Sequence, residues 1–219
     1  MQLTISGVLP TYFEKSRSVT SELWGKELVF EKGELVKIVA PSGSGKSSLI
    51  NFLYGMRSDY EGSIRFGNQA VRSLPIEDLA VLRKDHISIV FQDLRLFPEQ
   101  TVRENLEIKR QLNPFHPPPA SASADKIVEM TRRLGIESKL ESKAGICSYG
   151  EQQRVAIIRS LMQPFEFLLL DEPFNHFDGP NAEKAMELML EEAKLRDACI
   201  FFADLERIDY YPFTRLLHL

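Results

Sequence analysis

The segment APSGSGKSS, from Ala40 to Ser48, constrains the fold of this chain more than any other stretch. An apolar run that predicts a strand (35–40) precedes it, and a stretch with apolar residues at helical spacing (46–56) follows. Glycines between a strand and a helix let the backbone curl around phosphate oxygens, and the helix N-terminus adds unpaired N–H groups. The sequence therefore predicts an α/β fold with a phosphate-binding loop, formed by Pro41, Ser42, Gly43, Ser44, Gly45, Lys46, Ser47 and Ser48.

Two adjacent carboxylates from a distant part of the chain complete the predicted site. The apolar segment FLLL predicts a strand that carries Asp171 and Glu172 to the carboxyl edge of the sheet, where open α/β sheets bind ligands. We expect Lys46 to reach the β- and γ-phosphates of ATP, while Ser47 and Asp171 bind Mg²⁺. Glu172 is the candidate general base that orients and deprotonates the attacking water.

Periodicity along the rest of the chain predicts strands that alternate with helices, which indicates a largely parallel sheet. Residues 57–92 carry strand and turn signals, and Thr101 with Glu104 forms a capping box that opens a helix. Several short strands are predicted within the first 40 residues, and further strand signals lie at 64–67 (an edge hairpin), 87–92, 167–170 and 199–203. Further helices are predicted at 125–134, at 155–162 and from Pro180. The proline-rich segment 113–124 is interpreted as a surface loop.

Composition narrows the function classes. The formal net charge of −4 gives no reason to expect nucleic-acid binding. Two cysteines, Cys147 and Cys199, favour reduced thiols over a disulfide scaffold or a zinc site. No apolar run approaches the roughly 20 residues of a membrane-spanning helix, and the N-terminal segment MQLTISGVLP is unlike a secretion signal.

A third motif separates this chain from other phosphate-binding-loop proteins. The segment SYGEQQR, Ser148 to Arg154, resembles the LSGGEQQR signature of the ATP-binding subunits of ABC transporters. Gln92 in VFQDLRLFP is similar to the family's Q-loop, and Asp178 in FNHFD is similar to the acid of its D-loop. The motifs have the family's order and spacing over essentially the whole chain.

The resemblance implies a P-loop NTPase of ABC ATPase type, with a mainly parallel core sheet, an antiparallel β lobe and a helical lobe. It implies a single domain (1–219), in which 1–93 and 164–219 form the nucleotide-binding core with the β lobe and 94–163 form the helical lobe that bears the signature. Gln92 is then expected to contact nucleotide and Mg²⁺ and to take part in catalysis.

The family's architecture also implies a second chain. Two subunits are expected to pack head to tail, so that each ATP lies between the P-loop of one and the signature of the other. Ser148, Gly150, Glu151 and Asp178 are the candidate nucleotide contacts on that side, because a helix N-terminus there faces an anion. For the aromatic that stacks on adenine we favour Tyr12, with Phe13 beside it and Trp24 as the rival.

The chain departs from the family pattern at four positions. Ala40 replaces the first glycine of the P-loop motif, Cys147 replaces a leucine, and Tyr149 replaces the first glycine of the signature. In FFADLE, Ala203 stands where the family has its switch histidine, which contacts the γ-phosphate and positions water. Alanine can do neither, so we expect slow hydrolysis with binding retained. His176 is interpreted as a surface or interface residue rather than a replacement.

The leading hypothesis is an ATPase subunit that drives a membrane-embedded transporter or mechanotransmission partner, similar to the lipoprotein-releasing, cell-division and macrolide-export subfamily. That partner is expected to dock near Gln92–Pro98, which places the chain in the cytoplasm on the inner face of the membrane. The alternative is a hydrolysis-impaired ATP-binding clamp that pairs with an unlike subunit. A DNA-repair ATPase or a P-loop kinase fits less well. The cargo, and the choice between homodimer and heterodimer, are open.

Overall fold

The computed structural model describes residues 1–14, 16, 20–112, 124–205 and 213–219. The strands are β1 (Leu3–Pro10), β2 (Glu27–Phe30), β3 (Leu35–Val39), β4 (Tyr60–Phe66), β5 (Gln69–Ala70), β6 (Ile87–Val90), β7 (Phe167–Asp171), β8 (Cys199–Asp204) and β9 (Arg215–His218). The α-helices are α2 (Lys46–Leu53), α3 (Ile76–Asp85), α4 (Val102–Arg110), α5 (Ala124–Arg133), α6 (Tyr149–Leu161) and α7 (Gly179–Arg196). The predicted loop at 113–124 lies outside the described residues except for its last residue, which begins α5.

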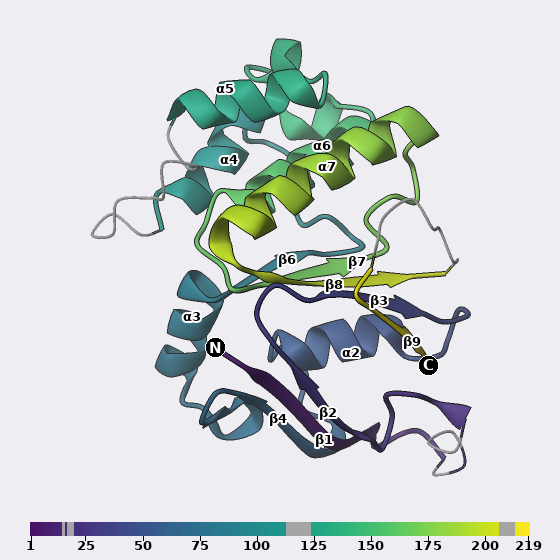
Figure 1. Cartoon of the computed structure of the whole chain (residues 1–219). Coiled ribbons are helices and arrows are strands. Elements are labelled where there is room, and N and C mark those ends of the chain that lie inside the picture. The colour runs from purple at the N-terminus through teal and green to yellow at the C-terminus, as the bar shows by residue number, and fades with distance from the viewer. Residues whose placement is uncertain (15, 17–19, 113–123, 206–212) are drawn as a thin grey trace.

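The centre of the molecule is a parallel sheet in the order β6-β7-β8-β3-β9. Figure 1 shows α2 on one side of this sheet and α6 and α7 on the other. An antiparallel sheet in the order β2-β1-β4-β5 lies beyond α2. The predicted fold class, a mainly parallel core with an antiparallel β lobe and a helical lobe, is confirmed, and the 64–67 hairpin lies at the sheet edge as β4 and β5.

Strand β8 shows how the parallel sheet divides the core. Side chains alternate between the two faces of a strand, and Phe201 packs into a buried cluster with α2 and the antiparallel sheet. Phe202 packs into a second cluster with α6, α7 and the helical lobe. Both rings are at most 2% exposed, so the central strands are apolar on both faces, as parallel strands covered by helices must be.

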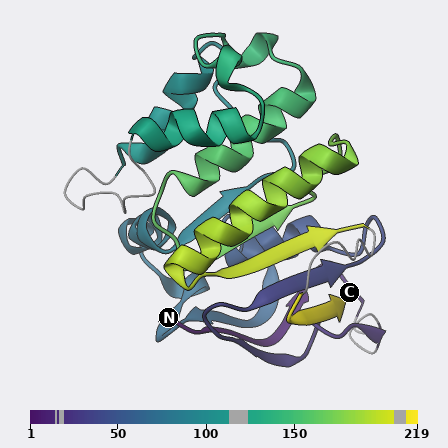
Figure 2. The ribbon, with the colours of Figure 1, turned by 45° about the horizontal axis from the view of Figure 1, so that its top comes forward.

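The helical lobe, α4 to α6, lies at the top of Figures 1 and 2, and two of its helices, α4 and α6, begin with capping boxes. The predicted capping box is confirmed: Thr101 accepts from the Glu104 N–H, and the Glu104 carboxylate accepts from the Thr101 N–H at 2.7 Å. A second capping box, formed by Ser148 and Glu151, starts α6 at Tyr149, well before the predicted start at Val155. The signature segment is therefore the first turn of a helix.

Two further predictions about local structure were wrong, and one strand was missed. Residues 76–85 form α3, although strand and turn signals were predicted there, because this surface helix buries only Leu82 and so lacks a clear apolar stripe. Helix α2 ends at Leu53 rather than at Met56. Gly55, two residues after the helix end, adopts a left-handed φ of 70°, which stops the helix from continuing. Strand β9 was not predicted, since it pairs with β3 through contacts between distant parts of the chain.

Within the described residues, no helix combines the length and apolar character needed to cross a membrane.

Lys109 in α4 carries a largely buried ammonium in the helical lobe. Its ammonium donates to Gln163 Oε1 at 2.5 Å, and burial lowers its pKa from 10.5 to about 8, with a smaller contribution from Arg159. The folded chain therefore holds this proton less tightly than the unfolded chain, so the lysine lowers stability below pH 8, and this cost is relieved as the pH rises from about 8 to 10.5.

We expect Lys109→Met to gain stability relative to the wild type at pH 7 and to lose that relative gain between about pH 8 and 10.5, measured by urea unfolding across the range. Lys194→Met, at an exposed position on α7, is the matched control and should show no such pH dependence. A pH-independent difference for Lys109→Met would contradict the assignment.

Candidate active site

The phosphate-binding loop runs from the end of β3 to the start of α2, at the carboxyl edge of the parallel sheet. Gly45 is the N-cap of α2 with a φ of 98°, in the left-handed region that favours glycine. A Cβ there would lie 3.0 Å from Trp24 Cζ2 and 3.1 Å from the Phe13 ring. Trp24, 1% exposed, donates from Nε1 to Ser44 O at 3.2 Å, so it supports the loop from below.

Lys46 is buried in this loop, with 5% of its surface exposed. Its Nζ donates to Ala40 O at 2.8 Å and to Pro41 O at 3.2 Å, and lies 3.5 Å from Glu172 Oε1. A buried ammonium is stable only with such partners. Because they hold the Lys46 ammonium inside the loop, it can bind an anion that enters the loop. The alanine at position 40 retains the carbonyl that Lys46 uses.

Glu172 contacts the other two predicted catalytic residues, Lys46 and Gln92. It follows β7 with a φ of 49°, a strained value for a non-glycine residue, and its N–H donates to Ala203 O at 2.9 Å. Its Oε2 accepts from Gln92 Nε2 at 3.1 Å and from Asn175 Nδ2 at 2.6 Å. The structure thus brings Lys46, Gln92 and Glu172 together, and their catalytic roles stay a prediction. Asn175 was not predicted, although its place three residues after Glu172 was a usable signal.

Asp171, at the end of β7, is 4% exposed, and burial raises the pKa of its carboxyl to about 6. Ser47 hydrogen-bonds to it and partly offsets that shift, while the charge on Glu172 adds to it. Asp171 Oδ1 has no hydrogen-bond partner among the described residues, and Ser47 Oγ donates to Gln92 Oε1 at 3.4 Å. An orphaned carboxylate oxygen beside a hydroxyl and an amide oxygen fits a hard cation such as Mg²⁺.

A pocket of about 310 Å³ opens over the loop. Its lining is Tyr12, Phe13, Ser42, Gly43, Gly45, Lys46, Ser47, Ser48, Gln92 and Glu172. Tyr12 is 51% exposed and shares a hydrogen bond of 2.5 Å with Ser48 Oγ, so its ring is accessible beside the loop. Trp24 is buried and cannot offer a free face to a base, which leaves Tyr12 with Phe13 as the candidate adenine platform.

The signature residues lie elsewhere. Ser148, Gly150 and Asp178 line a separate pocket of about 250 Å³, formed where α6 and α7 begin. Glu151 caps α6 and pairs with Lys139 at 3.3 Å, and Asp178 caps α7 by accepting from the Asn181 N–H at 2.9 Å. The single chain does not bring these four residues into the pocket over the P-loop.

The departures from the family pattern have clear places in the structure. Ala203 is fully buried in the cluster around α2, and its carbonyl accepts from Glu172. The described residues that line the P-loop pocket include no histidine. His176 lines the signature pocket instead, where its ring lies 4.3 Å from the Tyr149 ring. Tyr149 also donates to Gln92 O at 3.1 Å.

A phosphate loop with a buried lysine, opposite two carboxylates at the edge of a parallel sheet, defines a P-loop nucleoside triphosphatase. The family model described as ABC transporter matches residues 25–175, more than half of the sequence. The chain therefore belongs to the ABC transporter ATP-binding family, whose members bind and hydrolyse ATP to power a transporter.

Similar proteins include the lipoprotein-releasing system ATP-binding protein LolD 1 of Rhodospirillum rubrum, 33% identical over 82% of this chain and 78% of that protein. The macrolide export ATP-binding/permease protein MacB of a Shewanella species is 33% identical over 86% of this chain but only 29% of its own length. Among solved structures, the dimeric post-hydrolysis state of the ATP-binding cassette MJ0796 bound to ADP and Pi has a TM-score of 0.79 at 27% identity, and covers 93% of this chain and 88% of that one.

Proposed function

We propose that two copies of this chain, or this chain and an unlike ATPase subunit, bind Mg-ATP between them in a head-to-tail dimer and drive a membrane-embedded partner. The separation of the two half-sites carries this proposal. The P-loop pocket holds Lys46 and Glu172, while the signature helix presents Ser148 and Gly150 on a different pocket of the same chain. Only a second chain can bring a signature helix N-terminus onto the nucleotide. The MJ0796 cassette, which this chain resembles, is a dimer with ADP and Pi.

The residues have complementary roles in this proposal. The loop N–H groups and Lys46 bind the phosphates, and Tyr12 stacks on the base. Ser47, Gln92 and Asp171 would hold Mg²⁺, which neutralises charge on the phosphate oxygens when bound. Glu172, fixed by Gln92 and Asn175, accepts the proton of the attacking water.

We propose slow hydrolysis, because a methyl group at Ala203 cannot donate to a γ-phosphate or orient water. The P-loop residues Gly43, Gly45, Lys46 and Ser47 are present, so we expect affinity to be retained. The alternative is a clamp that binds ATP and leaves hydrolysis to an unlike partner. The division into a nucleotide-binding core (1–93 and 164–219) and a signature-bearing helical lobe (94–163) remains part of the proposal.

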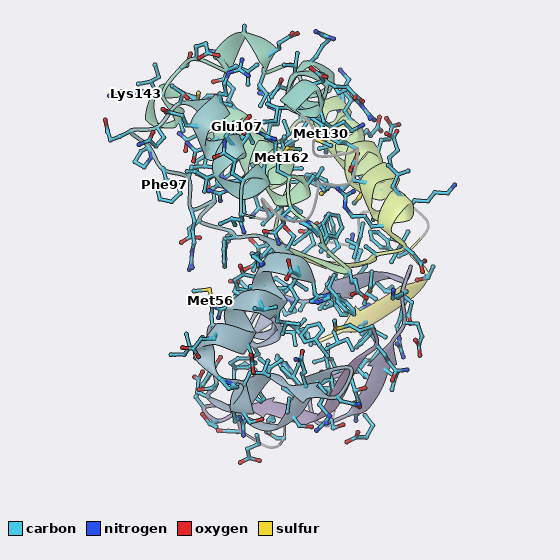
Figure 3. The ribbon with its side chains drawn as sticks, turned by 90° about the vertical axis from the view of Figure 1, so that its left-hand side faces the viewer. Met56, Phe97, Glu107, Met130, Lys143 and Met162 are labelled. Atoms are coloured by element: carbon cyan, nitrogen blue, oxygen red, sulfur yellow. The ribbon has the colours of Figure 1, made fainter. Side chains whose placement is uncertain are left out.

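For the membrane partner we propose docking near Gln92–Pro98, on the cytoplasmic side. Leu94 is buried at 3%, but Phe97 is 52% exposed and Met56 is 41% exposed. Figure 3 shows Met56 and Phe97 on one side of the molecule, near the boundary between the helical lobe and the core. Arg95 adds a cation to this surface: it donates to Met56 Sδ at 3.3 Å and pairs with Asp93 at 3.1 Å. This surface suits an apolar segment that also carries a carboxylate.

The rate of ATP hydrolysis by the complex with the membrane subunit tests the ATPase. We expect at least about tenfold slower turnover than in a family member that has the switch histidine, with similar affinity for a fluorescent ATP analogue. Glu172→Gln should remove the residual activity. A rate equal to that of the histidine-bearing enzyme would contradict slow turnover, and equal rates for Glu172→Gln and the wild type would favour the clamp.

Phe97→Asp tests the docking surface. A buried carboxylate without a partner is costly, so we expect the variant to lose the membrane subunit on co-purification while it keeps its affinity for the ATP analogue. Leu195→Asp is the matched control, because Leu195 is 72% exposed on α7 and should tolerate a charge. Retention of the membrane subunit by Phe97→Asp would contradict docking at this surface.

A further inference from the structure

Tyr149 is the first residue of α6 and stands where the family has a glycine. Its hydroxyl donates to the backbone carbonyl of Gln92 at 3.1 Å. Its ring packs edge to face on His176, with centroids 4.3 Å apart and planes at 68°. A glycine at this position could make neither contact, so both depend on the tyrosine side chain.

The two contacts reach the two segments whose side chains donate to Glu172 Oε2. Gln92, whose carbonyl Tyr149 binds, donates from Nε2 to Glu172 Oε2 at 3.1 Å, and its Oε1 accepts from Ser47. His176, whose ring Tyr149 touches, directly follows Asn175, which donates to the same Glu172 oxygen at 2.6 Å. One side chain in the helical lobe therefore contacts both segments that fix the candidate base.

The segment after Gln92 needs such support. Leu94 and Arg95 have φ values of 56° and 50°, in the left-handed region that costs energy for non-glycine residues. Arg159, also in α6, donates to Leu94 O at 2.6 Å and to Arg95 O at 2.7 Å. Helix α6 thus holds this strained segment at two points, Tyr149 at its start and Arg159 near its end.

We propose that Tyr149 is a positioning residue that holds Gln92, and through the His176 contact Asn175, in place around Glu172 and the candidate metal oxygens. The inference rests on the proposed function, since it concerns the same site. It means that the substitution of the signature glycine ties the helical lobe of this chain to its own catalytic cluster.

Tyr149→Phe is the direct test, because it keeps the ring on His176 and removes only the donor to Gln92. In the nucleotide-free chain, we expect faster hydrogen–deuterium exchange of the amides at 92–95. Binding of a fluorescent ATP analogue in EDTA should be unchanged, while the Mg²⁺ concentration that half-saturates the gain in affinity should rise about threefold to tenfold, as expected for one lost hydrogen bond. Ile146→Ala, at a 78% exposed position just before the signature, is the control and should change neither quantity.

A double-mutant cycle separates positioning from general structure. In a Gln92→Ala background the side chain that Tyr149 positions is gone, so Tyr149→Phe should leave the Mg²⁺ dependence unchanged. The same shift in both backgrounds, or no change in exchange at 92–95, would overturn the inference. If the wild type itself shows no Mg²⁺-dependent binding, the proposed function fails, and the exchange measurement still decides whether Tyr149 anchors Gln92.

Discussion

The burial of the Lys46 ammonium is the constraint on which the rest of the site depends. A charge that is 5% exposed must be met by hydrogen-bond acceptors or a counter-charge, and the chain supplies the carbonyls of Ala40 and Pro41 together with Glu172. To present those carbonyls, the loop must curl, which requires the left-handed Gly45 and the supporting Trp24. To present Glu172, β7 must end beside the loop. A phosphate group can replace these partners as the counter-charge, which makes the closed loop a receptor for nucleotide.

The same arrangement explains how the substitutions act. Ala40 retains the backbone carbonyl that Lys46 needs, so its methyl group is tolerated in the buried start of the loop. Ala203 keeps the carbonyl that orients Glu172 but brings no donor to the pocket. Tyr149 adds contacts from the helical lobe to Gln92 and His176. Binding, base positioning and water orientation thus rest on different side chains, and we propose that Ala203 affects the last of them.

Much of the fold could be predicted because local signals and tertiary packing agree in the central elements. The apolar strands β6, β7 and β8 are buried on both faces and read directly as continuous apolar runs. Helix α3 and strand β9 were missed because the sequence lacks such a signal there. Helix α3 buries one side chain, and β9 depends on pairing with β3. The start of α6 was missed although Ser148 and Glu151 form a recognisable capping box.

The P-loop half of the site was predictable because neighbouring residues in one motif build it. The Asn175 contact was missed although its spacing from Glu172 was a usable signal, whereas the Tyr149 contact was not predictable, since Tyr149 meets Gln92 only when α6 packs on the core. The Tyr149 contact arises from the placement of distant segments, and residue type alone does not indicate it. The separation of the signature from the P-loop also becomes visible only in three dimensions.

The central claim is that the nucleotide completes its site across two chains. The mass of the Glu172→Gln variant in solution, measured by light scattering during gel filtration, tests this most directly, because slowed hydrolysis preserves bound ATP. If two copies of the chain pair, we expect a monomer with Mg-ADP and a dimer with Mg-ATP, and we expect Ser148→Arg to abolish the dimer. If the chain pairs with an unlike ATPase subunit, we expect the same ATP-dependent association with that subunit. A chain that binds Mg-ATP and stays monomeric with either partner would show that the nucleotide does not complete its site across two chains.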